Sequence, residues 1–353
     1  MRTTSNTRSR RPCNSGMACS HAGKQSAYAV CLLASYFTMA SAQLFNDVPG
    51  LSTAAQNALV THFDGRVGVS VNGTGGVTAW EGRDGNGNVV VTANRAGNAD
   101  DGSLTNNNIT RNASNSALVF TESVTNQTAH LLAELFDING SMVTGGEYTI
   151  LWRGSYSGSN PQNNGTLGRY AYNLTTAEPN VIYGGFNHQR RNAAENVGTF
   201  VQSKTGGGSQ TLLGDSISSF NDTPTVWTSL YNFTAPGGTL DFFATDSNGN
   251  RSDLNVADPS AAQGTHSFTV LDSPYLYIGA ISHPFGGTST NGGFSFIGEM
   301  EQLIIFEGTL NSSDIAAVES YLTTIPEPSA IALFLTFGAA ACLVLRPRLR
   351  RGR

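Results

Sequence analysis

Cysteine and lysine are nearly absent from the long middle part of this 353-residue chain. Between residues 43 and 325 there is no cysteine, and Lys204 is the one lysine. This part therefore has no disulfide, thiolate metal site or cysteine nucleophile. The four cysteines lie in the two end segments, at Cys13, Cys19, Cys31 and Cys342.

Basic charge of any kind is scarce in the same part. Residues 43–326 hold ten basic and 24 acidic residues, a formal charge of −14, whereas the whole chain carries −5. Five basic residues precede this part and five follow it. Because an acidic surface repels phosphate backbones, we expect no nucleic-acid partner.

The N-terminal segment has the order of a secretory signal. An uncharged, largely apolar run, Ala27–Ala40, follows a basic, polar stretch and ends in Ala40-Ser41-Ala42. This pattern predicts a signal peptide over residues 1–42, cleaved before Gln43. The charged region is long for a signal, and a true start at Met17 would give an ordinary length.

The C-terminal segment, 326–353, combines three features. Pro326-Glu327-Pro328 precedes 17 uncharged residues, Ser329–Leu345, and five arginines follow them. At about 1.5 Å per residue, 17 helical residues span about 26 Å, close to the thickness of a hydrocarbon core. We therefore predict a transmembrane helix over 329–345, with the arginines in the cytoplasm and the acidic domain outside.

This tail resembles the PEP-CTERM sorting signal of exported bacterial proteins, through Pro326, Glu327, Pro328, the apolar run and the arginine cluster. The resemblance implies recognition by exosortase-type sorting machinery in the inner membrane. It also implies processing near Pro326–Pro328 and release to the cell envelope or extracellular matrix. Such a signal marks a destination and leaves the activity of the domain open.

The middle part, 43–325, has the pattern of one all-β domain. Glycine is abundant, with 40 residues, and short β-rich runs alternate with Gly/Asn/Asp/Ser clusters without a Pro/Ser linker. This spacing is typical of two stacked antiparallel sheets. Two segments have a helical pattern, Thr53–Thr61 and Asn311–Leu322, the second with Asn311 as N-cap. The predicted strands are Arg66–Val71, Val89–Ala93, Ala117–Thr121, Tyr148–Gly154, Arg169–Asn173, Val181–Phe186, Thr199–Ser203, Val226–Phe233, Leu240–Thr245, His266–Val270, Tyr275–Ile281 and Phe294–Phe306.

Two runs indicate how the sheets are covered. Residues 148–154 alternate, with Tyr148, Ile150 and Trp152 on one face. Leu303–Phe306 is apolar on both faces, which predicts a strand that is covered on both sides.

Two stretches have a distinctive order of residues: Ala79–Ala93, with Trp80 and Asp84–Asn88, and Gly292–Leu322, with Phe296, Gly298 and Glu301. These stretches resemble the LamG-like, concanavalin A-type jelly rolls. The resemblance implies a two-sheet antiparallel jelly-roll sandwich with a short C-terminal helix. It leaves activity open, because this fold hosts lectins, glycanases, adhesion modules and structural domains. The matching residues are Trp80 and Asp84–Asn88 in the first stretch, and Gly279, Phe296, Gly298, Glu301, Ile304, Ile305, Leu310, Ser312, Asp314 and Ile315 in the second.

Glu299 and Glu301 are the candidates for catalytic carboxylates. A retaining glycanase needs two carboxylates about 5 Å apart. Glucanases of this fold use E-x-D-x-x-E, but here Glu301 replaces the aspartate and Ile304 replaces the last glutamate. We therefore expect a protein that is not an enzyme, with a divergent glycoside hydrolase as the alternative.

Two Asp/Asn/Gly loops offer oxygen ligands for Ca²⁺, which takes six to eight of them. The same sequences are common hairpin turns, so the loops suit either role. The first choice is Asp246, Asn248, Asn250 and Asp253, and the alternative is Asp84, Asn86 and Asn88.

Aromatic residues within the predicted strands suit stacking on sugar rings, although a core would use them equally well. The pair Arg190-Arg191 either lies on a loop that grips an acidic sugar or is simply solvated. We expect an exported, non-catalytic module that binds a polysaccharide or a surface protein; a purely structural matrix protein is a further alternative. The aromatic residues are Trp152, Tyr156, Tyr170, Tyr172, Tyr183, Phe186, Trp227 and Tyr231.

Overall fold

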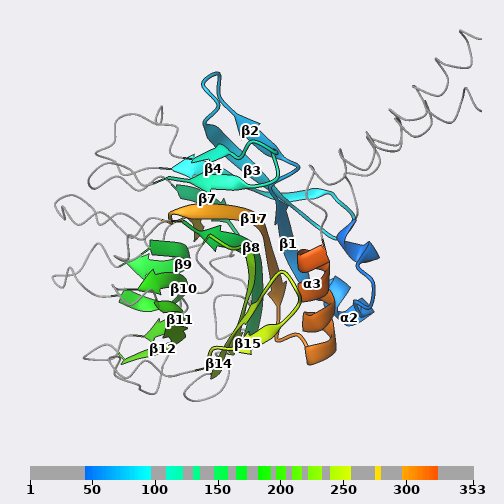
Figure 1. Ribbon diagram of the computed structural model, residues 1–353, viewed down its shortest axis with the longest axis vertical. Helices are drawn as coiled ribbons and strands as arrows, with labels where there is room; N and C mark the ends of the chain where they lie inside the picture. The colour runs from blue at the N-terminus through cyan, green and yellow to red at the C-terminus, as the bar shows by residue number, and fades with distance from the viewer. Residues whose placement is uncertain are drawn as a thin grey trace, which may run out of the picture. The chain divides into compact units, whose positions relative to one another are not determined.

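The computed structural model is nearly all antiparallel β-structure (Figure 1). The predicted strand His266–Val270 and the segments 1–42 and 326–353 lie outside the described residues. For strands β9 to β12 the backbone and its pairing are described. The described residues are 44–96, 109–121, 130–135, 147–157, 164–172, 182–191, 196–203, 209–216, 222–232, 239–255, 275–279 and 296–324.

Apart from His266–Val270, each predicted strand has a counterpart in the structure, and six of these are longer than predicted. Arg66–Val71 is reduced to its last three residues because 65–68 form a turn. The helical elements are η1 (Phe45–Asp47), α2 (Thr53–Ala58) and α3 (Ser312–Thr324). The strands are β1 (Leu59–Asp64), β2 (Val69–Val71), β3 (Val77–Arg83), β4 (Val89–Ala96), β5 (Ile109–Arg111), β6 (Leu118–Phe120), β7 (His130–Glu134), β8 (Glu147–Tyr156), β9 (Asn164–Tyr172), β10 (Ile182–Arg191), β11 (Asn196–Ser203), β12 (Ser209–Ser216), β13 (Thr225–Asn232), β14 (Thr239–Thr245), β15 (Arg251–Asp253), β16 (Tyr275–Ile278) and β17 (Gly298–Glu307).

The first layer has the strand order β15–β14–β13–β8–β17–β1. Strand β17 lies inside this layer, since β8 pairs with one edge of it and β1 and β6 pair with the other. The second layer has the order β12–β11–β10–β9–β16–β7–β4–β3–β2. The layers are joined where β1 pairs with β3, at His62 opposite Arg83 and Phe63 opposite Gly82.

The interior between the layers is filled by large apolar side chains. This interior cluster contains Trp80, Leu131 and Ile278 of the second layer and Trp152 and Trp227 of the first. All five side chains are almost fully buried. Tyr148 and Ile150 lie in the same cluster, which confirms the predicted face of the 148–154 run. The fold is therefore an all-β sandwich with one core.

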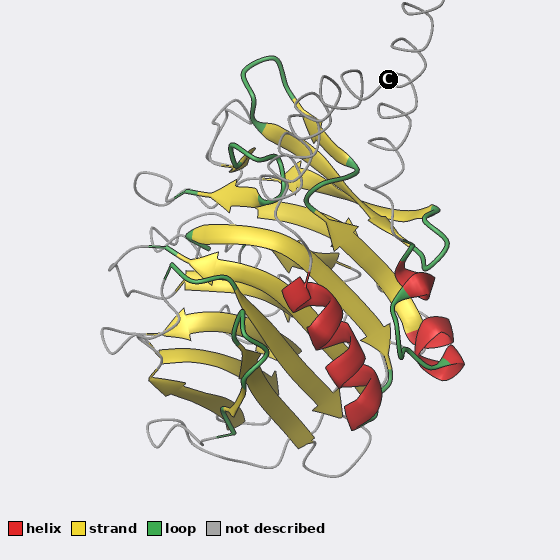
Figure 2. Ribbon diagram, turned by 45° about the vertical axis from the view of Figure 1, so that its right-hand side comes forward, coloured by secondary structure: helices red, strands yellow, loops and turns green. Residues whose placement is uncertain are grey.

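The outer face of the first layer is buried as well. Helix α3 and the N-terminal segment 44–58 lie against it (Figure 2), and a second apolar cluster joins them to Leu151, Ile304 and Phe306. Because Leu303 and Ile305 belong to the interior cluster, Leu303–Phe306 is covered on both faces, as predicted.

Polar contacts fasten α3 to the N-terminal segment. Asn311 caps the helix, since its Oδ1 accepts from the backbone N–H of Asp314 at 2.9 Å. The buried carboxylate of Asp314 accepts from the backbone N–H and the hydroxyl of Ser52, at 2.8 and 2.9 Å. Ser52 also caps α2, which ends at Ala58. The predicted helix Thr53–Thr61 is therefore wrong after residue 58, because β1 begins there and pairs with β17.

Candidate functional site

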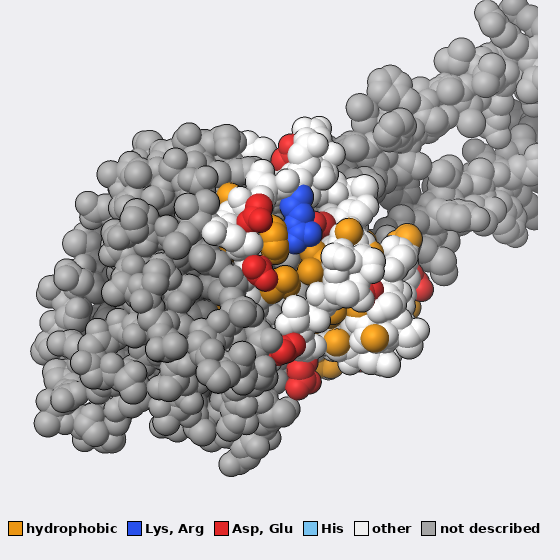
Figure 3. Space-filling view, turned by 90° about the horizontal axis from the view of Figure 1, so that it is seen from below, with side chains coloured by type: hydrophobic (Ala, Val, Ile, Leu, Met, Phe, Trp, Pro, Cys, Tyr) orange, Lys and Arg blue, Asp and Glu red, His pale blue; other side chains and the backbone are white. Residues whose placement is uncertain are grey.

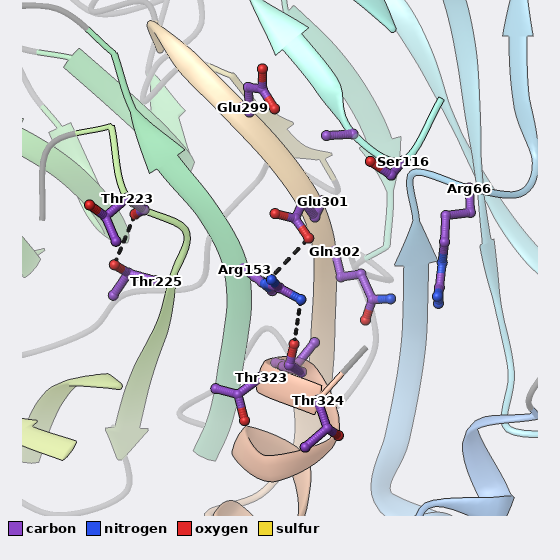
Figure 4. A network of polar contacts seen from close by, with 12 residues as sticks. Arg66, Ser116, Arg153, Thr223, Thr225, Glu299, Glu301, Gln302, Thr323 and Thr324 are labelled. Atoms are coloured by element: carbon purple, nitrogen blue, oxygen red, sulfur yellow. Dashed lines mark hydrogen bonds and ion pairs between the residues drawn. The ribbon is translucent and has the colours of Figure 1, made fainter. Parts of the chain in front are cut away.

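The two glutamates proposed for catalysis lie on the outer side of β17, away from the sandwich interior. Met300, between them, is in the interior cluster, and a bulge after it turns both Glu301 and Gln302 outward. Glu299 accepts a hydrogen bond from Nδ2 of Asn112 at 3.3 Å. Glu301 forms an ion pair with Arg153, whose Nε lies 3.3 Å from Oε2 (Figure 4).

Arg153 links Glu301 to the end of α3. Its Nη1 donates to the backbone oxygen of Leu322 at 2.8 Å, one of the carbonyls that the last helical turn leaves unpaired. The side chains of Arg153 and Glu301 are 8% and 18% exposed. Both carboxylates of the candidate pair thus take part in contacts between strands, loop and helix.

A second polar cluster lies beside this pair and escaped the sequence analysis. Nε2 of His62 lies 3.2 Å from Oε1 of Gln302, and Asp64 accepts hydrogen bonds from Arg66, with the Arg66 Nε at 2.9 Å from Oδ1. The ring of Tyr321, on α3, packs edge-on against His62. The alternating order His62-x-Asp64-x-Arg66, which runs from β1 into the following turn, is the sequence signal that could have revealed this cluster.

Burial sets the charge states in this cluster. Desolvation lowers the pKa of His62, and the negative charge of Asp64 offsets this only in part. Burial also acts to raise the pKa of Asp64, but the hydrogen bonds and charge of Arg66 outweigh it and hold that pKa below its ordinary value. We therefore expect a neutral His62 beside an ionised Asp64 at neutral pH.

Acid should weaken the fold through His62. Its folded pKa is below the ordinary value of 6.5, so the unfolded chain binds the proton more readily. The contribution to stability is complete above pH 6.5 and is lost as the pH falls through the window between 6.5 and the folded pKa. Urea unfolding from about pH 7.5 to about pH 5.5 should show a steeper loss for the wild type than for His62→Gln. Parallel losses in the two proteins would contradict this assignment.

The two proposed calcium loops are identical turns. In each, the aspartate Oδ1 accepts from the backbone N–H two and four residues on, and Oδ2 accepts from the side-chain amide four residues on, at 2.8–2.9 Å. These bonds, first of all those from Asn88 and Asn250, lower the pKa of Asp84 and Asp246. Asp253 lies at the end of β15, where its Oδ1 accepts from the N–H of Asn255.

Among the described residues, no group of three or more His, Cys, Asp or Glu side chains could hold a metal ion. Charges of both signs are mixed on the described surface seen from below, where a basic area borders acidic and apolar side chains (Figure 3).

Four of the candidate aromatic residues lie in the interior cluster, and the other four lie on strands β9 and β10. Trp152, Tyr156, Trp227 and Tyr231 are buried in the interior cluster and serve the core. The others lie on neighbouring strands β9 and β10, where Tyr172 is opposite Ile182, Ala171 opposite Tyr183, Tyr170 opposite Gly185 and Arg169 opposite Phe186.

The pair Arg190-Arg191 lies at the end of strand β10 and not on a loop. Arg190 and Arg191 pair there with Val197 and Asn196 of β11.

The sorting residues Pro326, Glu327 and Pro328 and the predicted signal lie outside the described residues. Within the described part of the chain, no helix has the length and apolar character needed to cross a membrane.

No protein-family model and no curated protein matches the chain. Solved structures that resemble it include the receptor-binding domain of botulinum neurotoxin mosaic serotype C/D, with 9% identity and a TM-score of 0.43 over 76% of this chain and 51% of that one. The sialidase of Trypanosoma rangeli has 14% identity and a TM-score of 0.45, over 86% and 40%. CBM40 of the Ruminococcus gnavus IT-sialidase, solved with α2,3 sialyllactose, has 12% identity and a TM-score of 0.35, over 58% and 96%.

The chain spans about half the length of the neurotoxin chains that it matches and less of the Trypanosoma rangeli sialidase. All three TM-scores are below 0.5, and no function follows from likeness at this level.

Proposed function

We propose that this chain is an exported, non-catalytic LamG-like jelly-roll module that binds a polysaccharide through strands β9 and β10. The observation that carries the proposal is the division of the aromatic residues. Those of β8 and β13 are used in the core, while Tyr170 and Tyr172 lie two residues apart on β9, on one face of the second layer. Adjacent aromatic residues on a sheet suit stacking against sugar rings.

The partners of Glu299 and Glu301 support a binding role over hydrolysis. A glycosidase needs one carboxylate as nucleophile and one protonated carboxyl as acid. Here Glu301 is paired with Arg153, and Glu299 is held by Asn112. Both carboxylates are therefore already engaged in contacts with neighbouring parts of the fold.

Calcium is not needed by this proposal. The carboxylate oxygens of Asp84 and Asp246 already accept hydrogen bonds within their own loops, and each loop contains one charged side chain. This donor set fits a closed hairpin turn better than a calcium site with six to eight oxygens.

The two ends of the sequence support the export of the domain. The order of Pro326-Glu327-Pro328, an apolar run and an arginine cluster supports tail-directed sorting by an exosortase-type enzyme, after cleavage of the signal over 1–42. The precursor would be held in the inner membrane with the domain outside.

A glycan array with residues 43–325 tests the function. We expect selective binding to at least one polysaccharide, unchanged by EDTA, and no release of reducing ends. The double variant Tyr170→Ala/Tyr172→Ala should bind about tenfold more weakly, which corresponds to about 1.4 kcal/mol, with an unchanged melting temperature. Lack of binding to any glycan would refute the proposal. Hydrolysis that Glu299→Gln abolishes would support the glycosidase instead.

A further inference from the structure

Three exposed apolar side chains come from two segments that meet at the turn 84–88, the first described residues and the start of β4. Leu44, Val89 and Val90 are 39%, 47% and 51% exposed, and we call them the apolar edge. Leu44 Cδ2 lies close to Gly87, because a Cβ atom added to this glycine would be 3.1 Å from it. The backbone N–H of Asn46 donates to the oxygen of Gly85 at 3.2 Å, so the first described residues are bound to the turn that leads into Val89 and Val90.

The last turn of α3 lies at the same edge. The ring of Phe45, next to Leu44, is 5.7 Å from the ring of Tyr321 and 5.2 Å from that of His62. His62 is opposite Arg83, which is opposite Val89 across the β3–β4 pair. Tyr321 is three residues before Thr324, where α3 ends. The described chain thus begins and ends beside the apolar edge.

Few residues separate this edge from the apolar run in the tail. Residues 325–328 connect α3 to Ser329, and an extended chain of four residues spans at most about 14 Å. If residues 329–345 are in a bilayer, the end of α3 is held within this distance of the lipid.

We propose that the apolar edge rests on the surface of the bilayer that holds residues 329–345. The inference depends on the membrane-inserted precursor of the proposed function and adds which surface of the domain contacts lipid. Transfer of exposed aliphatic side chains from water into the interfacial region of a bilayer lowers the free energy, because apolar surface is buried. Arg83 and Arg66, at the same edge, are paired with Glu81 and Asp64. The contact should therefore depend on the apolar side chains more than on anionic lipid.

Tryptophan quenching in vesicles tests the contact. The chain has three tryptophans, and Trp80, Trp152 and Trp227 are all buried, so they give a constant background. The full chain carrying Val90→Trp or Val89→Trp is reconstituted in phosphatidylcholine vesicles whose acyl chains are brominated near the headgroup. The introduced tryptophan should be quenched about twofold or more relative to unbrominated vesicles.

Val71→Trp is the matched control. Val71 is 50% exposed and pairs with Val77, at the other end of β3 from Arg83. At about 3.3 Å per residue, these ends of β3 are about 20 Å apart, so Val71→Trp should not be quenched by the brominated lipid.

Each other outcome overturns the inference in a recognisable way. If the chain does not float with the vesicles, the tail is not inserted, and that part of the proposed function fails with it. If the chain floats but Val90→Trp and Val71→Trp are quenched equally little, the inference alone is wrong. If Val90→Trp is shielded from aqueous iodide without quenching by lipid, and the chain sediments as a dimer, the edge binds a second copy instead.

Discussion

Trp152→Ala is expected to lower the free energy of unfolding by about 3–5 kcal/mol, the cost of a large cavity in a packed core. The indole of Trp152 stacks on Trp227 at 5.9 Å between ring centroids and meets the ring of Tyr156 edge-on at 5.7 Å. Trp227 stacks in turn on Phe242, so the stack crosses β8, β13 and β14. Urea unfolding with an unchanged m-value measures the loss.

An exposed residue is the control for this substitution. Val71→Ala, on the surface of β2, should change stability by less than about 0.5 kcal/mol. Glycan binding gives a second comparison, because Trp152→Ala should lose binding only as it unfolds, unlike the Tyr170/Tyr172 variant. A loss below about 1 kcal/mol for Trp152→Ala would mean that the site collapses without a cavity.

Arg153→Met should destabilise the domain by about 2–3 kcal/mol, because the change removes the positively charged partner of a mostly buried carboxylate. Glu301 would lose its ion-pair partner, and the carbonyl of Leu322 would lose its donor. The figure is below that for a fully buried pair because Glu301 keeps 18% of its surface in solvent.

The double variant Arg153→Met/Glu301→Met should recover most of this loss, since the buried carboxylate is removed together with its charged partner. Arg83→Met is the matched surface control: Arg83 and Glu81 are each 34% exposed, and their pair should be worth about 0–1 kcal/mol. If Arg153→Met and Arg83→Met cost the same, the Arg153–Glu301 pair does not hold α3.

The parts of the fold that sequence predicts well are those with a clear period. The alternation of 148–154 and the two-sided run Leu303–Phe306 place their side chains as expected, because each face is set by local order. The helix after Asn311 begins where its cap predicts. Residues 59–61 look helical locally, but pairing with β17, more than 240 residues away, makes them a strand.

The candidate site depended on features that no local pattern contains. The bulge after Met300 decides that Glu301 faces outward to Arg153 on the neighbouring strand. Asn112, which holds Glu299, comes from a loop 187 residues earlier. The glucanase-type pattern drew attention to these two carboxylates, but their partners are set by the three-dimensional fold.

The pairing of β1 with β17 also fixes an order of events in folding. Leu59 lies opposite Phe306, and the hydroxyl of Ser52 donates a hydrogen bond to Asp314. The first described residues can therefore form these contacts only after almost the whole domain has been synthesised. Contacts this distant along the chain form slowly. In a chain exported as proposed, most of the domain would cross the membrane before β1 and β17 could pair.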